Sequence, residues 1–422
     1  MFHKTTLKNG LRILTIPQEG TKTVTVLVLV GTGSKYEKRE ISGISHLLEH
    51  MVFTGTEKRP RQQDVAEPLD RVGGIYNAFT GEEYTGFFAK VDSKHFDLAA
   101  DVVSDIFLNP RLRQQDLEKE KGVVIEEINM YYDNPVSYVQ TLWGKLLYGD
   151  QPAGWGILGT KESVSGISRE NLADYIKSQY SAKNVIVCVA GNIPDKNVIE
   201  EKIKKYFSKI SEAKYFEKTK TKEEQDKPEC ILQTRKTDQA HFCLGVRAYN
   251  LFHPLRYAQE ILATALGGMM SSRLFIKIRE ELGMAYYIST SAMPFTDCGY
   301  LVTQAGVDTK RIETAISAVL GEYKKIAEKG IPEDELKKSK DHLTGKMTLL
   351  LEASDAQASF YGLQDVLEKE ILTPEQTYDK INKVSSSDVR KVAKDIFRPQ
   401  KLNLALIGPF EDKEKFLKLI QI

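Results

Sequence analysis

The sequence feature that most constrains this chain is the stretch His46-Leu47-Leu48-Glu49-His50. On an α-helix, residues three and four apart share a face, so both histidines and the glutamate project together while neighbouring leucines supply apolar contacts. Two imidazoles one turn apart can chelate a single Zn²⁺ ion, and an adjacent carboxylate can accept a proton from water. The stretch therefore predicts a helix that begins after Ser42, a plausible N-cap, and that carries an inverted zinc-binding motif.

A metal site of this kind needs one more donor. A catalytic zinc takes three protein ligands and leaves one position for water, so His46 and His50 require a third. The best candidates lie in one predicted helix, where Glu120 and Glu127 are seven residues apart and share a stripe. Glu126 is rotated by about 100° from Glu127. Spacing alone does not choose between Glu126 and Glu127, and an acidic helix face is usually only solvated.

The composition narrows the class of protein. A chain of 422 residues, of which 41% are hydrophobic and 28% charged, is long enough for two or three domains with a substantial core. The net charge of +1 indicates neither a disordered chain nor a basic nucleic-acid surface. The sequence contains no run of eighteen apolar residues, no apolar leader and no C-x-x-C pair. We therefore expect a soluble cytoplasmic protein without nucleic-acid or membrane partners.

The chain divides into two similar halves. The segment 211–228 is rich in Lys, Glu and Thr and nearly lacks apolar residues, which is typical of an exposed linker. The strand-like run 184–191 is followed by a helical pattern, and so is the run 402–408 near the end of the chain. This repeat predicts an α+β protein with two domains of the same fold, 1–210 and 229–422, each a mixed or antiparallel sheet with helices packed on one face.

Local patterns predict the individual elements of the first half. Asn9-Gly10 supplies the positive φ angles of a tight hairpin turn, and Pro68 puts the continuity of a helix after Arg61 in doubt. The predicted strands are 5–7, 11–16, 23–30, 75–80, 84–91 and 184–191. The predicted helices are 92–108, 114–132, 138–147, 169–180 and 195–207.

Several separated motifs carry a family resemblance. The H-x-x-E-H stretch is followed by Met51-Val52-Phe53-Thr54-Gly55-Thr56, by Gly73-Gly74-x-x-Asn77-Ala78-x-Thr80 and by Glu120-x-x-Val123-Val124-x-x-Glu127. Together these motifs resemble the pitrilysin, insulysin and mitochondrial processing peptidase family over nearly the whole chain. The resemblance implies that one Zn²⁺ per chain is bound by His46, His50 and Glu127. It also implies that Glu49 is the general base and that Glu120 supports the catalytic set.

The second half carries a further match to the same family. A glycine-containing loop at 266–275 precedes Arg279 and Tyr286, which resemble the family's Arg/Tyr element. The resemblance gives both residues a catalytic and substrate-binding role, holding substrate and stabilising the tetrahedral oxyanion. On physical grounds alone, Arg279 would be a surface ion-pair partner and Tyr286 a packing aromatic.

The resemblance also implies how substrate is held. Asn77, Ala78 and Thr80 match the family's edge strand, which pairs with an extended peptide through main-chain hydrogen bonds. Such a site takes unfolded peptides of many sequences.

The function expected from these matches is that of a zinc endopeptidase that cleaves unfolded peptides or oligopeptides inside an enclosed chamber. The family's chamber needs four such domains, so a chain with two would form half of the clamshell and act as a homodimer. Two alternatives stay open. One is a processing subunit that needs a paralogous partner, and the other is a non-catalytic scaffold of the same fold, as found in a respiratory complex.

Overall fold

The computed structural model describes residues 2–368 and 370–421, which form two compact units. Of the described residues, unit 1 comprises 2–129, 155–219, 348–368 and 370–373, and unit 2 comprises 130–154, 220–347 and 374–421. These units differ from the domains expected from the sequence in two segments. Residues 130–154 lie in unit 2 rather than with the first half, and residues 348–373 lie in unit 1 rather than with the second.

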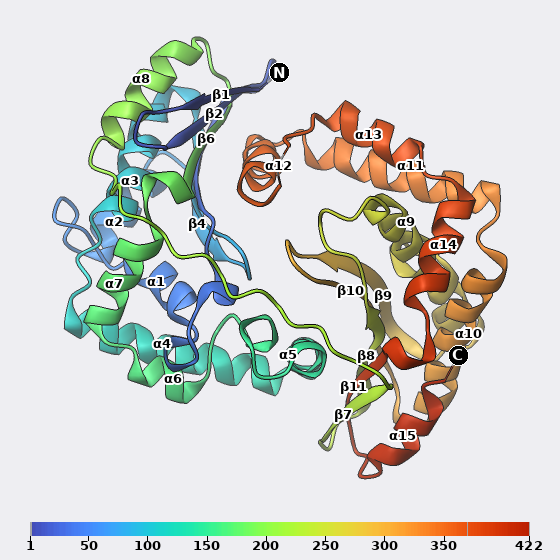
Figure 1. The fold of residues 1–422 in the computed structure, drawn as a ribbon. Coiled ribbons are helices and arrows are strands. Elements are labelled where there is room, and N and C mark those ends of the chain that lie inside the picture. Colours follow the sequence, from blue (N-terminus) through green and yellow to red (C-terminus); the bar gives the residue numbers. More distant parts are fainter. Residues whose placement is uncertain (1, 369, 422) are drawn as a thin grey trace. The chain divides into compact units, whose positions relative to one another are not determined.

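Unit 1 is built on a six-stranded sheet (Figure 1). Its strands, in the order β1-β2-β6-β3-β5-β4, are β1 (His3–Thr6), β2 (Arg12–Pro17), β6 (Val185–Gly191), β3 (Thr23–Val30), β5 (Thr85–Asp92) and β4 (Ile75–Thr80). Its helices are α1 (Ile44–Val52), α2 (Gln62–Asp70), α3 (Phe96–Leu108), most of α4 (Gln114–Asp133), α6 (Lys161–Gly166), α7 (Arg169–Gln179), α8 (Lys196–Tyr206) and α12 (Ser354–Leu367).

Unit 2 is built on a five-stranded sheet. Its strands, in the order β7-β11-β8-β10-β9, are β7 (Glu229–Thr234), β11 (Leu402–Gly408), β8 (Gln239–Arg247), β10 (Gly299–Asp308) and β9 (Ala285–Pro294). Its helices are α5 (Pro135–Tyr148), α9 (Arg256–Gly267), a π-helix (Phe275–Glu281), α10 (Ile312–Lys329), most of α11 (Glu333–Leu350), α13 (Pro374–Asn382), α14 (Ser386–Ile396) and α15 (Lys413–Leu419).

The two sheets share one topology. In unit 1 the pair β2 and β6 is parallel and the other neighbouring pairs are antiparallel, and in unit 2 the pair β7 and β11 is the parallel one. Strand β1, which forms a hairpin with β2 through Gly10 at φ 93°, is the extra strand of unit 1. The predicted α+β class with mixed sheets is confirmed.

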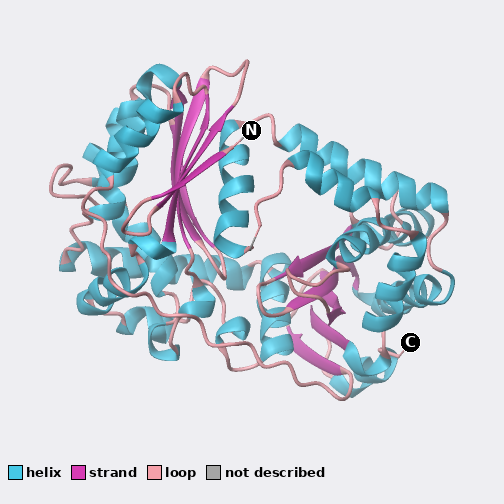
Figure 2. Cartoon of the chain, turned by 45° about the horizontal axis from the view of Figure 1, so that its top comes forward, coloured by secondary structure: helices cyan, strands magenta, loops and turns pink. Residues whose placement is uncertain are grey.

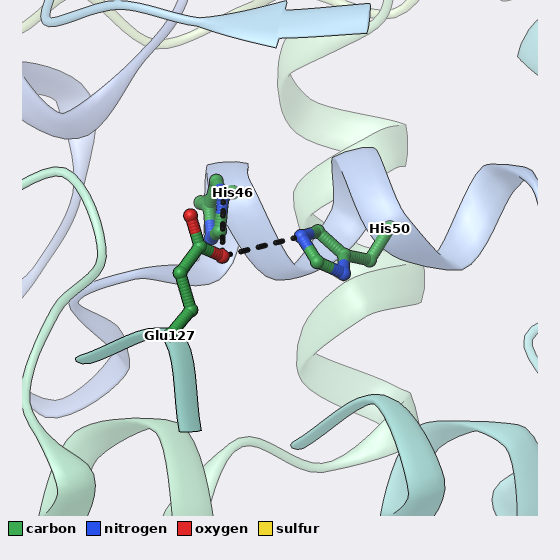
Figure 3. A group of neighbouring side chains, drawn as sticks. All are labelled: His46, His50 and Glu127. Carbon is green, nitrogen blue, oxygen red and sulfur yellow. Dashed lines mark ion pairs between the residues drawn. The ribbon is translucent and has the colours of Figure 1, made fainter. Parts of the chain in front are cut away.

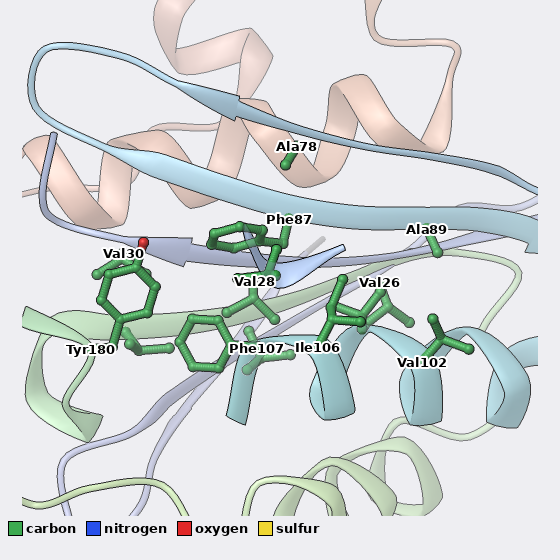
Figure 4. Packing of buried hydrophobic residues seen from close by; sticks show 14 of the residues in the cluster. Val26, Val28, Val30, Ala78, Phe87, Ala89, Val102, Ile106, Phe107 and Tyr180 are labelled. Atoms are coloured by element: carbon green, nitrogen blue, oxygen red, sulfur yellow. The ribbon is translucent and has the colours of Figure 1, made fainter. Parts of the chain in front are cut away.

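The core of unit 1 lies between the sheet and its helices (Figure 4). Because successive side chains of a strand point to opposite faces, Val26, Val28 and Val30 of β3 face α3, whose Ile106 and Phe107 pack against them. Leu27 and Leu29 of the same strand face the other way. Strand β3 is therefore buried on both sides, as its sequence of Val, Leu and Thr residues indicates.

One helix from the far half of the sequence covers the second face of each sheet. Helix α12 packs on β3 and β6 of unit 1 (Figures 1 and 2), where Ala358 and Tyr361 meet Leu27 and Leu29. Helix α5 packs on β11 and β8 of unit 2, where Trp143 joins a cluster of apolar residues. Helices were expected on one face of each sheet, so these two are additions to the predicted layers.

Several local predictions have definite outcomes. Helix α2 continues through Pro68, which did not break it. Helix α5 begins at Pro135, three residues earlier than predicted, because the Asn134 side chain accepts a hydrogen bond from the backbone N–H of Val136 and caps the helix. No helix within the described part of the chain is long and apolar enough to cross a membrane.

Candidate metal centre

Helix α1 carries the H-x-x-E-H motif and is held firmly in unit 1. Its apolar face, formed by Ile44, Leu47, Leu48 and Met51, has no exposed surface. That packing leaves His46 nearly buried and Glu49 and His50 partly exposed on the other side of the helix. The helical spacing expected from the sequence therefore places the three polar side chains as predicted.

The start of α1 is capped in a way that the sequence did not indicate. The N-cap is Gly43, at φ 93°, rather than Ser42, and a glycine has no side chain that could cap the helix. Instead the carboxylate of Glu37 accepts hydrogen bonds from the backbone N–H groups of Gly43 (2.7 Å) and Ser45 (2.9 Å). Burial raises the pKa of Glu37 to about 7. The side chain of Glu37, which lies outside the helix, thus caps the free backbone N–H groups at the start of α1.

The third donor comes from α4. The Oε2 atom of Glu127 lies 3.5 Å from Nε2 of His46 and 3.7 Å from Nε2 of His50, and the three side chains point toward one another (Figure 3). One ligand atom from each residue lies within 4.8 Å of the others. In contrast, Glu126 is exposed and its carboxylate bonds to the side chain of Asn129. The structure brings Glu127, not Glu126, to the histidines.

These donors suit zinc. Donors around a tetrahedral Zn²⁺ with bonds of ~2.1 Å lie about 3.4 Å apart, which matches the two distances to Glu127. Burial lowers the pKa of His46 to about 4, so its imidazole is neutral and can ligate at ordinary pH. The group of one carboxylate and two imidazoles leaves one position for water or substrate.

Glu120 contacts His50 at the ring nitrogen Nδ1. Its Oε2 lies 3.3 Å from Nδ1 of His50, and this hydrogen bond raises the pKa of the imidazole. A carboxylate that accepts the Nδ1 proton fixes the tautomer whose Nε2 lone pair is available, which is the orienting arrangement seen around many metal-bound histidines. The side chain of Glu120 is buried.

Glu49 lies between the two histidines in sequence and contacts strand β4. Its Oε2 accepts a hydrogen bond of 2.6 Å from Oγ1 of Thr80. Burial raises the pKa of Glu49, although the Thr80 bond and His50 act in the opposite direction. The family resemblance assigned Thr80 to substrate binding, and the sequence gave no sign of this contact.

The other predicted substrate residues lie on β4 or in unit 2. Strand β4 is the last strand of its sheet and pairs with β5. The Asn77 side chain accepts a bond from the backbone N–H of Ala78, which is buried. Arg279 lies on the π-helix of unit 2, 4.8 Å from the ring centre of Phe275. Tyr286, on β9, is 76% exposed. The roles that the resemblance gives these residues stay predictions.

The fold and this site define a class: a two-unit α+β protein with an inverted His/Glu/His motif on one helix and a glutamate on another. A model described as Insulinase (Peptidase family M16) matches residues 12–161, and one described as Peptidase M16 inactive domain matches residues 166–343. The chain belongs to peptidase family M16.

Full-length relatives support this assignment. An uncharacterized zinc protease of Bacillus subtilis, YmxG, is 34% identical over 97% of this chain and 98% of its own. An uncharacterized zinc protease of Streptomyces coelicolor is 32% identical over 97% of this chain and 90% of its own. Sequence and relatives thus agree on a short, two-domain member of the family.

Solved structures share the fold. The structure of a protease from Helicobacter pylori has a TM-score of 0.90 at 22% identity and covers 97% of this chain and 100% of that one. A chain of complex III2 from Candida albicans has a TM-score of 0.86 at 19% identity, with 100% of each chain covered. At these identities the likeness concerns the fold.

Proposed function

We propose that this protein is a zinc-dependent endopeptidase that hydrolyses unfolded peptides. The observation that carries the proposal is the convergence of His46, His50 and Glu127, with one ligand atom from each within 4.8 Å of the others. Glu49, on the same helix face, supplies a carboxylate for proton transfer. The relatives that are named zinc proteases support the same activity.

The residues have distinct roles in the proposed reaction. The metal, when bound by His46, His50 and Glu127, supplies Lewis-acid polarisation of the scissile carbonyl and lowers the pKa of a water. Glu49 accepts a proton from the attacking water, whose oxygen bonds to the carbonyl carbon. Glu49 then delivers the proton to the leaving amine as the C–N bond breaks. Glu120 keeps His50 in the tautomer and orientation that ligation requires.

We propose that the substrate is an extended peptide added to β4. In the described part of the chain, β5 is the only strand that pairs with β4, so the opposite edge can accept main-chain hydrogen bonds. Ile75 at the start of this strand is 59% exposed. Recognition through the backbone tolerates many sequences, and a folded protein would offer no free strand.

We further propose that the enzyme acts in the cytoplasm as a homodimer, with Arg279 and Tyr286 of one subunit serving the zinc site of the other. The support is the family resemblance, in which four domains close a chamber. A single type of chain carries both the metal-binding motif and the Arg/Tyr element, so a second kind of subunit is not needed.

The test is zinc content together with cleavage of an internally quenched, unstructured peptide. Wild type should bind about one zinc per chain and cleave the peptide. Glu49→Gln should keep zinc and lose cleavage, and Glu127→Ala should lose zinc. Glu126→Ala is the matched control on the same helix, and it should behave as wild type.

Other outcomes would point elsewhere. A wild-type protein that binds zinc but is inert alone would favour a processing subunit with a paralogous partner. A protein that binds no zinc would favour a scaffold. Light scattering of the purified protein tests the homodimer.

A further inference from the structure

The hydroxyl of Thr80 contacts the residue proposed as the general base. Thr80 is the last residue of β4, and its Oγ1 lies 2.6 Å from Oε2 of Glu49. Because a carboxylate only accepts hydrogen bonds, the threonine hydroxyl is the donor. A distance of 2.6 Å is in the range of charge-assisted O–H···O⁻ bonds, which are about twice as strong as neutral ones.

The backbone of Thr80 is fixed relative to α1. Thr80 pairs with Thr85 of β5, and the turn between them closes through a bond from the Gly81 N–H to the Tyr84 carbonyl (2.8 Å). The loop before α1 binds the same turn, because Lys35 N–H donates to the Glu82 carbonyl (2.9 Å). The end of β4 and the approach to α1 are therefore joined by main-chain bonds.

A close approach of two backbone segments also links the turn after β4 to the loop before α1. A Cβ atom on Gly33 would lie 2.1 Å from the carbonyl oxygen of Gly81, so only glycine fits there. The carboxylate of Glu83, in the same turn, pairs with Lys35 (3.0 Å) and with Lys218 (2.8 Å), and all three side chains are largely buried. Thr80 is thus presented to Glu49 by a rigid turn rather than by a mobile loop.

We infer that Thr80 is a positioning residue for Glu49. The Thr80 hydroxyl holds one oxygen of the Glu49 carboxylate, so that the other oxygen faces the attacking water. This inference rests on the proposed function. A glutamate side chain has three rotatable bonds, and a fixed hydrogen bond removes much of the freedom that would otherwise misalign proton transfer. In this role the Thr80 hydroxyl acts through Glu49, which differs from the substrate-binding role that the family resemblance implies.

Two substitutions test the inference kinetically. Thr80→Val keeps the shape but removes the hydroxyl, and it should lower kcat by about 10- to 100-fold with KM and zinc content unchanged. Thr80→Ser keeps the hydroxyl and should recover most of kcat. Thr25→Val is the matched control: it removes a buried hydroxyl on β3 that lies 2.9 Å from the Ser354 hydroxyl, away from the turn that carries Thr80, and it should leave kcat within about two-fold of wild type.

Different kinetic patterns would overturn the inference. A rise in KM at constant kcat would return Thr80 to substrate binding. Equal losses in Thr80→Val and Thr80→Ser would make its packing, rather than its hydroxyl, the important feature.

A structural readout separates this inference from the proposed function. Crystal structures of zinc-free wild type and Thr80→Val should show one orientation of the Glu49 carboxylate in wild type and several in the variant. An unchanged orientation in the variant would refute the positioning role. If wild type cleaves no peptide, the proposed function fails, while these two structures still decide whether Thr80 orients Glu49.

Discussion

At the scale of single residues, the candidate centre depends on buried carboxylates that do not themselves bind metal. Glu120 holds His50 through its Nδ1 atom, and Glu37 holds the first turn of α1 through two backbone N–H groups. Both act on the geometry of the proposed ligands from outside the cluster. Their effects can be measured separately from catalysis.

Removing Glu120 should weaken metal binding. In Glu120→Ala, the His50 ring loses the carboxylate that fixes its tautomer, so zinc affinity should fall about 10- to 100-fold. The measurement is competition with a chelator of known affinity. Glu126→Ala, which removes an exposed carboxylate from the same helix, is the control. Equal affinities of the two variants would contradict the role assigned to Glu120.

Glu37 should make stability depend on pH. Its pKa is raised from 4.5 to about 7 in the folded protein, so the folded state binds this proton more tightly than the unfolded chain. The resulting stabilisation is complete below pH ~4.5 and is lost as pH rises through about 7, a change of about 3 kcal/mol.

The test compares urea unfolding of wild type and Glu37→Gln with chelator present at every pH. Between pH 5 and pH 8 the free energy of unfolding of wild type should fall relative to that of the variant. Glu40→Gln, at an exposed position, should keep the wild-type dependence. Parallel curves for wild type and Glu37→Gln would show that Glu37 does not titrate in this range.

The sequence predicted part of the site for a clear physical reason. Helical spacing brings His46, Glu49 and His50 to one face whatever the rest of the chain does. The choice of Glu127 over Glu126 depends on how α4 is rotated in the fold, which spacing does not reveal. The family resemblance implies Glu127, the glutamate that the structure places beside the two histidines. Glu37 lies six residues before the N-cap, so no capping pattern indicates it.

At the scale of elements, α12 shows how closely a helix is fitted to its sheet. A Cβ atom on Gly362 would lie 2.6 Å from Cδ1 of Leu29 and 2.7 Å from Sγ of Cys188. Ser354, at the start of the helix, lies 2.9 Å from the Thr25 hydroxyl. The glycine permits an approach that a side chain would block.

A pair of glycine substitutions tests this fit. Gly362→Ala should lower the free energy of unfolding by about 1–3 kcal/mol, because the added methyl group overpacks the core. Gly345→Ala in α11 meets no atom within 4 Å and should stabilise the protein by up to ~1 kcal/mol through helix propensity. Urea unfolding of both variants is the measurement. A stabilised Gly362→Ala protein would mean that α12 is packed more loosely.

Predictions of helices and strands succeeded where the local sequence determines the structure, and they failed where contacts between distant segments determine it. The strand 23–30 was predicted correctly, because a run of Val, Leu and Thr residues favours a strand that is buried on both faces. The linker 211–228 has no helix or strand, as expected. Its Lys218, however, pairs with the buried Glu83, although the composition indicated only solvated charge.

At the scale of the whole molecule, each unit contains a segment from the other half of the chain. Residues 348–373 complete unit 1, and residues 130–154 complete unit 2. The amphipathic patterns of α5 and α12 indicate that each packs on an apolar surface, but they do not specify which sheet provides it. The sequence therefore revealed the repeat without revealing this exchange.

The exchange predicts that the first half is not an independent folding unit. A fragment of residues 1–228 lacks α12, so Leu27, Leu29 and Ile186 lose their cover. We expect this fragment to bind hydrophobic dyes and to lack a cooperative thermal transition. Fusion of residues 348–373 to its end should restore the transition. Cooperative unfolding of residues 1–228 alone would show that α12 is dispensable for folding.

The exchange also has a consequence for biosynthesis. Strand β6, the last strand of the first sheet, ends at Gly191, whereas α12 begins only at Ser354. At roughly 5–20 residues per second, a ribosome needs on the order of ten to thirty seconds to make the chain between them. For that time the nascent sheet presents an uncovered apolar face. Such a face is a binding site for chaperones at the ribosome exit, and slower translation of the second half would prolong the need for them.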